Sequence, residues 1–352
     1  MTVENEQQII ETINDIKKQN GDKLVILGHY YQRREILTVA DYMGDSFELA
    51  RRAASLDDAK YIIFCGVHFM AESASILSKP YQTVQLPDLD AGCPMADMAR
   101  LPEVEKAWNT ITEFIPSSQI VPITYMNSIA SIKAFCGRHG GAVCTSSNAN
   151  ILFKWARQQG KKIFFLPDEH LGRNTAHNLN IPEDKMFVWD PLMPDDKRII
   201  ANIDAVELIL WKGHCHVHTF FNVEHVNYIR KNFPSAVIIA HPECTRDVIQ
   251  QVDYSGSTSF IERYVKEAPS GSVIAIATEI NMVDRLARQY ADKQIIPVAR
   301  SLCPNMFKIN LPKLKTTLEQ LGRYNIIEVP QSVRQDAHRA LSAMLSVVQS
   351  AQ

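Results

Sequence analysis

Seven cysteines are spread over this chain of 352 residues, and their sequence surroundings divide them into two kinds. Cys65 and Cys144 lie in apolar, strand-like runs and Cys136 lies in a helical stretch, where a thiol is typically a small buried hydrophobic group. An odd number of cysteines over a long chain does not indicate a disulfide framework. The remaining thiols stand in polar loops and are therefore candidate metal ligands or reactive groups: Cys93, Cys215, Cys244 and Cys303.

The segment KGHCHVH around Cys215 offers a second kind of metal chemistry. His214, His216 and His218 flank this cysteine, and imidazole and thiolate are the usual protein ligands of zinc. The loop cysteines form no CxxC pair, so spacing alone leaves three possibilities open. These are an iron–sulfur cluster, a zinc site of a hydrolase, and thiols without a metal.

Polar side chains also gather where the apolar runs end. Since ligands of parallel α/β proteins bind beyond the carboxyl ends of the strands, these residues indicate a ligand site. The alternative is ordinary turn and capping chemistry, but the number of such ends favours a site. The segments are GHYYQ (28–32), GVHFMAES (66–73), TYMNS (124–128), CTSSN (144–148), LPDEHLGR (166–173), AHPEC (240–244) and ATEINM (277–282).

Several of these turns lead directly into predicted helices. The free N–H groups and the dipole at a helix N-terminus favour anions, so phosphate or carboxylate groups are the expected ligands. No GxGxxG or GxxxxGK[ST] motif is present, which argues against a dinucleotide or nucleoside triphosphate. The residues at or near these helix starts are Ser46, Asn127, Ser146, Ser257 and Thr258.

The elements that must position these residues are short apolar runs alternating with amphipathic helical stretches, a pattern typical of parallel α/β folds. The runs fall into three groups, each roughly 100 residues long. We therefore predict three related α/β units at 1–88 (with the C-terminal 304–352), 89–190 and 191–303. A weak strand is expected at 325–329 (NIIEV), and the final helix, DAHRALSAMLSVVQ, is expected to pack on the first unit.

The composition excludes several classes of protein. Hydrophobic residues make up 46% and charged residues 22%, and the formal net charge is −2, without the basic surplus of a nucleic-acid-binding protein. No run approaches the ~18 apolar residues of a membrane span. The polar N-terminus lacks the apolar core of a signal peptide, so a cytoplasmic protein is expected.

In order and spacing, the motifs resemble those of the quinolinate synthase family over roughly residues 25–310. The motifs that carry this resemblance are HYYQ, GDSFELAR, GVHFMAESA, AGCPMAD, TYMNS, CTSSNA, LPDEHLGR, KGHCHVH, AHPEC, GSTSF and ATE. The resemblance implies three pseudo-symmetric α/β domains around a central [4Fe–4S] cluster with three cysteine ligands and one open iron position. It assigns these ligands to Cys93, Cys215 and Cys303.

The same resemblance implies an enzyme that condenses iminoaspartate with dihydroxyacetone phosphate to form quinolinate for NAD biosynthesis. An L-aspartate oxidase or dehydrogenase is the implied supplier of iminoaspartate. Proton transfer is assigned by resemblance to Tyr31, His241 and Glu243. His170 and Glu279 also match family positions, and substrate binding is assigned to His29, Ser46, Tyr125, Asn127, Ser146, His218, Ser257 and Thr258.

One feature departs from the pattern of some family members. They carry the third cluster ligand within a CxxCxxC run, whereas Cys303 stands alone behind Arg300 and Ser301. A thiol–disulfide switch built on the extra pair is therefore not expected. A zinc hydrolase and a non-catalytic sensor of small anions are the rival hypotheses, which metal analysis and a turnover assay would separate.

Overall fold

The structure is a computed structural model that describes residues 5–193 and 205–351. Its first unit is built on a four-stranded parallel sheet. Its strands lie in the order β2-β1-β3-β4. The C-terminal helices α16 (Leu311–Glu319) and α17 (Gln331–Ser350) follow much later in the chain. The elements are α1 (Glu6–Asn20), β1 (Leu24–His29), α2 (Arg34–Leu37), β2 (Tyr42–Gly44), α3 (Ser46–Ser55), β3 (Tyr61–Cys65), α4 (His68–Leu77) and β4 (Thr83–Gln85).

The second sheet is also parallel and has five strands, in the order β6-β5-β7-β9-β8. Strand β9 pairs with both β7 and β8, so this sheet continues past the predicted boundary at residue 190. Its elements are α5 (Pro94–Asp97), α6 (Leu101–Thr112), β5 (Ile120–Tyr125), α7 (Ala130–Arg138), β6 (Ala142–Cys144), α8 (Ala149–Gln158), β7 (Lys162–Leu166), α9 (Glu169–Asn178), β8 (Met186–Trp189) and β9 (Leu208–Trp211).

The third sheet has four parallel strands in the order β11-β10-β12-β13. Short 3-10 helices occupy Gly21–Lys23, Ser117–Gln119, Glu183–Lys185 and Met306–Lys308. The elements of the third unit are α11 (His216–Thr219), α12 (Val223–Asn232), β10 (Val237–Ala240), α13 (Arg246–Ile249), β11 (Tyr254–Ser255), α14 (Thr258–Glu267), β12 (Val273–Ala277), α15 (Ile280–Gln289) and β13 (Gln294–Pro297).

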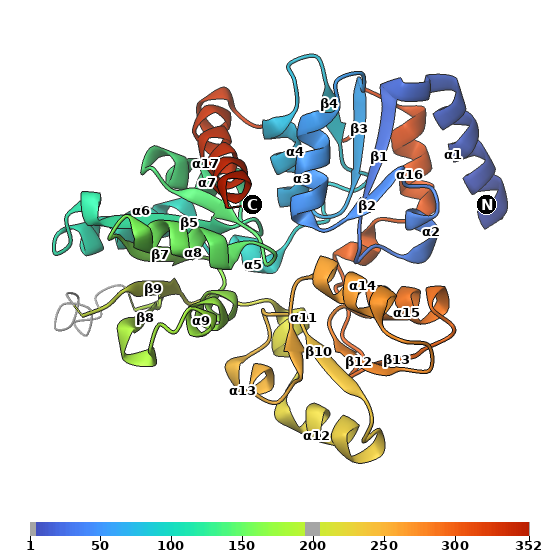
Figure 1. Cartoon of the computed structure of the whole chain (residues 1–352). Helices are drawn as coiled ribbons and strands as arrows, with labels where there is room; N and C mark the ends of the chain where they lie inside the picture. Colours follow the sequence, from blue (N-terminus) through green and yellow to red (C-terminus); the bar gives the residue numbers. More distant parts are fainter. Residues whose placement is uncertain (1–4, 194–204, 352) are drawn as a thin grey trace.

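The three units repeat one topology, in which the second strand of each unit lies at the edge, followed by the first and the third. The fourth place in the sheet is taken by β4, β9 and β13, and the second unit adds β8 beyond β9. Figure 1 shows the three sheets side by side, with helices covering them. The first strand of each unit, β1, β5 and β10, is almost entirely buried, as expected for parallel sheets covered on both faces. The predicted fold of three pseudo-symmetric α/β units is therefore confirmed.

The repeat extends to single residues, because the strand registers align corresponding positions. His29 pairs with Gly44 across β1 and β2, and Tyr125 pairs with Cys144 across β5 and β6. Ala240 pairs with Ser255, so the next residue, His241, occupies the position that corresponds to His29 and Tyr125. One polar or aromatic side chain thus leaves the end of the first strand of every unit.

The C-terminal segment differs in part from the expectation. Helix α16 packs on α1, but α17 lies mainly against α7 and β6 of the second unit, with a smaller contact to α4 (Figure 1). At this crossing a Cβ atom on Gly137 would lie 1.9 Å from the carbonyl oxygen of Asp336, so only glycine allows the approach. The predicted strand at 325–329 is reduced to a single bridge between Gln85 and Ile326.

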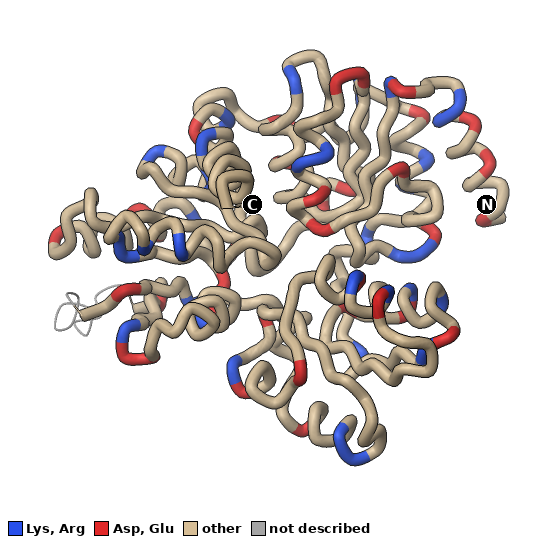
Figure 2. The backbone as a smooth tube through the Cα atoms, in the orientation of Figure 1, with Lys and Arg blue, Asp and Glu red and all other residues tan. Residues whose placement is uncertain are grey.

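The hydrophobic cores show how the units are joined. One continuous core runs through the first and second units and includes α16 and α17. The third unit has two clusters of its own, on the two faces of its sheet. Basic and acidic residues are interspersed over all three units (Figure 2). Among the described residues, no helix is both long and apolar enough to cross a membrane.

Candidate active site

The carboxyl ends of the three sheets surround one cavity. Every residue assigned to the site by sequence lines it except Ser257. The lining includes Cys93, Cys215, Cys303, Tyr31, His241, Glu243, His29, Ser46, Tyr125, Asn127, Ser146, His218 and Thr258. Ser257 is instead the N-cap of α14, where its hydroxyl accepts a hydrogen bond of 3.3 Å from the Phe260 N–H.

The three cavity cysteines occupy corresponding places, each in the segment that follows the strand in the fourth place of its sheet. Cys93 precedes α5, Cys215 precedes α11, and Cys303 accepts a backbone hydrogen bond from Met306. All three are free and partly exposed. The cysteines of the apolar runs and of α7 are buried, as predicted. Cys244 is also buried, although its loop-like sequence context predicted a candidate metal ligand or reactive thiol.

The thiols of the cavity are strongly desolvated. Burial raises the pKa of Cys93 to about 12, and the nearby Cys303 and Glu243 act in the same direction. Burial likewise raises the pKa values of Cys215 and Cys303. Thiolates at these positions therefore need a cation beside them, which is the situation of cysteines that ligate a metal centre. Three thiols facing one cavity fit a cluster held by three cysteines.

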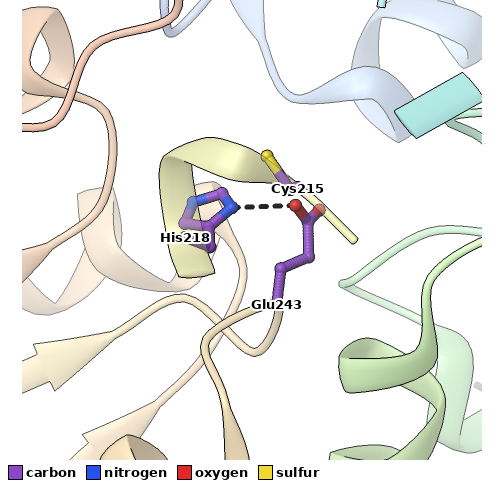
Figure 3. Close-up of side chains that lie close together, drawn as sticks. All are labelled: Cys215, His218 and Glu243. Atoms are coloured by element: carbon purple, nitrogen blue, oxygen red, sulfur yellow. Dashed lines mark hydrogen bonds and ion pairs between the residues drawn. The ribbon is translucent and has the colours of Figure 1, made fainter. Parts of the chain in front are cut away.

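Glu243 is the centre of a buried hydrogen-bond network that joins the three units. Its Oε2 lies 2.8 Å from Nδ1 of His218, and its Oε1 accepts a bond of 2.5 Å from the Tyr125 hydroxyl. The His218 Nε2 lies 3.3 Å from the Tyr31 hydroxyl, which lies 2.7 Å from Oγ1 of Thr278. Figure 3 shows the Glu243 carboxylate facing the His218 ring, with Cys215 beside them.

The charges of this network follow from its bonds. Burial acts to raise the pKa of Glu243, but His218 and His241 outweigh burial and lower this pKa to about 2. An ionised carboxylate accepts hydrogen bonds only, so Nδ1 of His218 carries the proton that points at Glu243. The His218 Nε2 faces the Tyr31 hydroxyl on the other side of the ring. Burial, followed by the charge of Glu243, raises the pKa of Tyr31 well above its ordinary range.

The two histidines at the strand ends remain neutral. Burial lowers the pKa of His241 to about 3 and that of His29 to about 4. Each uses Nδ1 to accept a backbone N–H two residues later, at 3.2 Å for His29 and 3.4 Å for His241. The ring of His241 also stacks on His218, with centroids 4.3 Å apart. Both histidines can therefore offer an Nε2–H to a ligand without carrying charge.

Another part of the cavity wall is suited to anions. Ser46 and Thr258 are the first residues of α3 and α14, while Asn127 and Ser146 each precede a helix by three residues. Two buried oxygens here, Oδ1 of Asn127 and Oγ1 of Thr145, have no partner among the described residues. Buried polar atoms usually find partners, so these atoms point to a bound ligand.

Two residues at the cavity were not named from the sequence. Thr278 bonds to the Tyr31 hydroxyl, and Asp45 lines the cavity. Both stand in family motifs, ATE and GDSF, from which only Glu279 and Ser46 were named. His218, which the resemblance assigns to substrate binding, lines the cavity and is also the partner of Glu243. The residues matching family positions at His170 and Glu279 do not line the cavity.

The histidines of KGHCHVH do not converge on one point. Within the described ranges, the group whose ligand atoms lie within 4.8 Å of one another consists of Cys215, His218 and Glu243. It contains neither His214 nor His216, so the zinc site suggested by the histidine spacing is not formed. Cys93 and Cys303 are not in this group, but they line the same cavity as Cys215, so the three cysteines remain candidate metal ligands.

The comparisons with known proteins agree with this geometry. Residues 11–346 match the family model described as quinolinate synthetase A protein. The chain belongs to this family. It is 50% identical over 340 residues to the quinolinate synthase of Geobacillus sp. (strain WCH70), covering 95% of this chain and 92% of that protein. It is 48% identical over 341 residues to that of Bacillus anthracis, covering 96% and 92%.

Among solved structures, the chain is similar to the E-1-hydroxy-2-methyl-but-2-enyl-4-diphosphate reductase of Plasmodium falciparum. The identity is 12% and the TM-score is 0.34, over 89% of this chain and 93% of that one. The family membership predicted from the motifs is therefore confirmed by the sequence comparisons alone.

Proposed function

We propose that this member of the quinolinate synthase family condenses iminoaspartate with dihydroxyacetone phosphate to form quinolinate in NAD biosynthesis. The reaction releases one phosphate and two waters. The observation that carries the proposal is the meeting of three free cysteines with the ionised Glu243 network in one cavity. Family membership supports the same reaction.

Cys93, Cys215 and Cys303 would hold one [4Fe–4S] cluster. When bound, such a cluster with an open iron position supplies a Lewis acid for the departing hydroxyl group. Each cysteine follows the strand in the fourth place of a different sheet, so the ligand set requires all three units to be assembled.

The anionic groups of the substrates are bound by the helix starts. Ser46, Ser146 and Thr258 line the cavity at or near N-termini whose N–H groups and dipoles favour phosphate and carboxylate. The unpartnered oxygens of Asn127 and Thr145 can accept hydrogen bonds from the imine or hydroxyl groups of the substrates. His29 and His241, both neutral, donate hydrogen bonds without adding charge.

Proton transfer is assigned to the network of Tyr31, His218 and Glu243. Glu243 fixes the proton of His218 on Nδ1, so the His218 Nε2 is the atom that accepts a proton. The Tyr31 hydroxyl lies 3.3 Å from this nitrogen, and both residues line the cavity, so the hydroxyl can pass a proton in either direction. His241, stacked on His218, keeps the imidazole ring in place.

Iminoaspartate hydrolyses readily because it is an imine, so the enzyme needs a reaction that supplies it. Oxidation of L-aspartate by an oxidase or a dehydrogenase is the proposed source.

The test is anaerobic purification, or reconstitution with iron and sulfide, followed by measurement of quinolinate formed from the two substrates. We expect about four iron and four sulfide per chain, as for one [4Fe–4S] cluster, and turnover that is lost in air. A chain that contains zinc alone, or that forms no quinolinate with the cluster intact, would refute the proposal.

A further inference from the structure

One cation is buried directly behind the wall of the catalytic cavity. Lys133 of α7 is 0% exposed. Its Nζ donates a hydrogen bond to the carbonyl of Ser128, the residue after Asn127, and lies 5.5 Å from the centre of the Phe69 ring. Asn127 and Phe69 both line the cavity, whereas Lys133 does not. The ammonium group therefore stands one layer of residues away from the cavity.

No carboxylate is bound to this ammonium group. Among the described residues, Lys133 forms no ion pair, whereas Arg285, which is also buried, pairs with Glu262. Glu72 of α4 is close enough to influence Lys133, but its Oε2 accepts a hydrogen bond of 3.0 Å from the Ala130 N–H. Buried charges in proteins are usually paired, so this one indicates a partner of opposite charge on the cavity side.

The cavity lining supplies no such cation itself. No lysine or arginine is among the described residues that line it, whereas Asp45 and Glu243 are. The cavity histidines His29 and His241 are neutral, because burial lowers their pKa values. The proposed substrates and product nevertheless carry phosphate and carboxylate groups. Their binding brings negative charge close to Lys133, and opposite charges attract over several ångströms in a protein interior.

The positive charge of Lys133 is present at neutral pH, although burial disfavours it. Burial lowers the pKa of Lys133 to about 8, while Glu72 acts in the opposite direction. A side chain with this pKa is still mostly protonated at pH 7. Solvent and salt screen a buried charge much less than a surface charge, so the field of Lys133 extends into the cavity.

We propose that Lys133 is a specificity-determining residue, which favours dianionic ligands in the cavity through its charge and without touching them. The inference rests on the proposed function, because the ligands concerned are its phosphate and dicarboxylate substrates and its dicarboxylate product. Lys133 is not a catalytic residue, since the Phe69 ring and the Asn127–Ser128 segment lie between its Nζ and the cavity.

The test compares two ligands of different charge on anaerobic, cluster-containing enzyme. Quinolinate has two carboxylates and picolinate has one; equilibrium dialysis of radiolabelled quinolinate, with picolinate as competitor, gives both dissociation constants. Lys133→Met fills a similar space and removes the cost of burying a charge, so the fold should be kept. We expect the dissociation constant to rise about tenfold for quinolinate and about threefold for picolinate, because a lost Coulomb attraction scales with ligand charge.

Lys106→Met is the matched control, since it removes the same charge from an exposed position on α6 and should leave both constants within about twofold of the wild type. Lys133→Gln is a second variant without the charge and should show the same contrast, should Lys133→Met fail to fold. Unchanged constants, or equal rises for the two ligands, would overturn the role of this charge while leaving the proposed function standing. Wild-type enzyme that neither forms nor binds quinolinate would instead refute the proposed function.

Discussion

Tyr125 of the second unit and Glu243 of the third are joined by a hydrogen bond of 2.5 Å, buried at the meeting point of the sheets. The tyrosine hydroxyl donates to a carboxylate that His218 also binds on its other oxygen. The two oxygens of Glu243 are thus held by different units. This arrangement fixes the ionised carboxylate and, through it, the proton position on His218.

We expect Tyr125→Phe to lower kcat/KM about 10- to 100-fold, because a hydrogen bond to a buried charged group is worth ~1.5–3 kcal/mol. The cluster should stay intact, because Tyr125 is not a cysteine ligand. Steady-state kinetics on anaerobic enzyme with measured iron content is the test. Tyr81→Phe is the control, because the hydroxyl of that exposed tyrosine donates to the carbonyl of Asp57, far from the network. Equal kinetics in both variants would remove Tyr125 from the site.

Loss of the Glu243 carboxylate charge should lower turnover more than the loss of the Tyr125 hydroxyl does. Glu243→Gln preserves the shape but cannot hold a proton on Nδ1 of His218 as a carboxylate does, so turnover should fall ~10²–10⁴-fold. Quinolinate formation by cluster-containing enzyme measures this change. Near wild-type turnover would mean that Glu243 and His218 do not act in proton transfer.

Much of this site was predictable because its residues stand at the ends of apolar runs. In a parallel sheet those ends meet at one edge, so the segments that carry His29, Tyr125 and His241 were expected at a site from local pattern, while the roles of these residues came from the family resemblance. The contacts between units were not predictable. Neither the bond from Ser259 to Asp45 nor the position of Thr278 leaves a local signal in the sequence.

The differences between the expectations and the structure have identifiable physical causes. Ser257 stands at a helix start as predicted, but its hydroxyl is used by the cap of α14. The apolar run NIIEV begins at Asn325, whose φ of 50° is left-handed, and it meets a strand β4 of only three residues. Helix α17 lies mainly on the second unit because Gly137 admits its backbone, a contact that no periodicity reveals.

The cysteine assignment predicts a sharp contrast between thiols. Replacing Cys93, Cys215 or Cys303 by alanine should abolish the iron and sulfide content measured after anaerobic reconstitution. Cys65→Ala and Cys244→Ala should keep both, because these thiols are buried away from the cavity. Full cluster content in Cys303→Ala would refute the assignment of that ligand.

The buried neutral histidines predict how stability depends on pH. Burial lowers the pKa of His29 from 6.5 to about 4, so the unfolded chain binds a proton here that the folded chain does not. Stability is therefore lost as pH falls from 6.5 towards 4, by roughly 1.4 kcal/mol per pH unit for this histidine. His29→Asn keeps an acceptor for the Tyr31 N–H and removes the titration. Urea unfolding of the variant should show a shallower decline over this range, whereas His338→Asn, at an exposed position, should follow the wild type. Parallel curves for His29→Asn and wild type would mean that His29 is protonated in the folded chain.

The last prediction concerns Tyr31, which lines the cavity and whose hydroxyl lies 3.3 Å from the Nε2 of His218. Tyr31→Phe removes the hydroxyl but keeps the ring that packs beside His29, with centroids 4.9 Å apart in the wild type. The variant should bind quinolinate and keep its cluster, while kcat falls ~10²–10⁴-fold and KM changes little. Tyr30→Phe is the matched control from the same turn, because the Tyr30 hydroxyl bonds to Glu48 at 3.3 Å, outside the network. If Tyr31→Phe instead raised KM with an unchanged kcat, Tyr31 would be a binding residue and the proton would travel by another route.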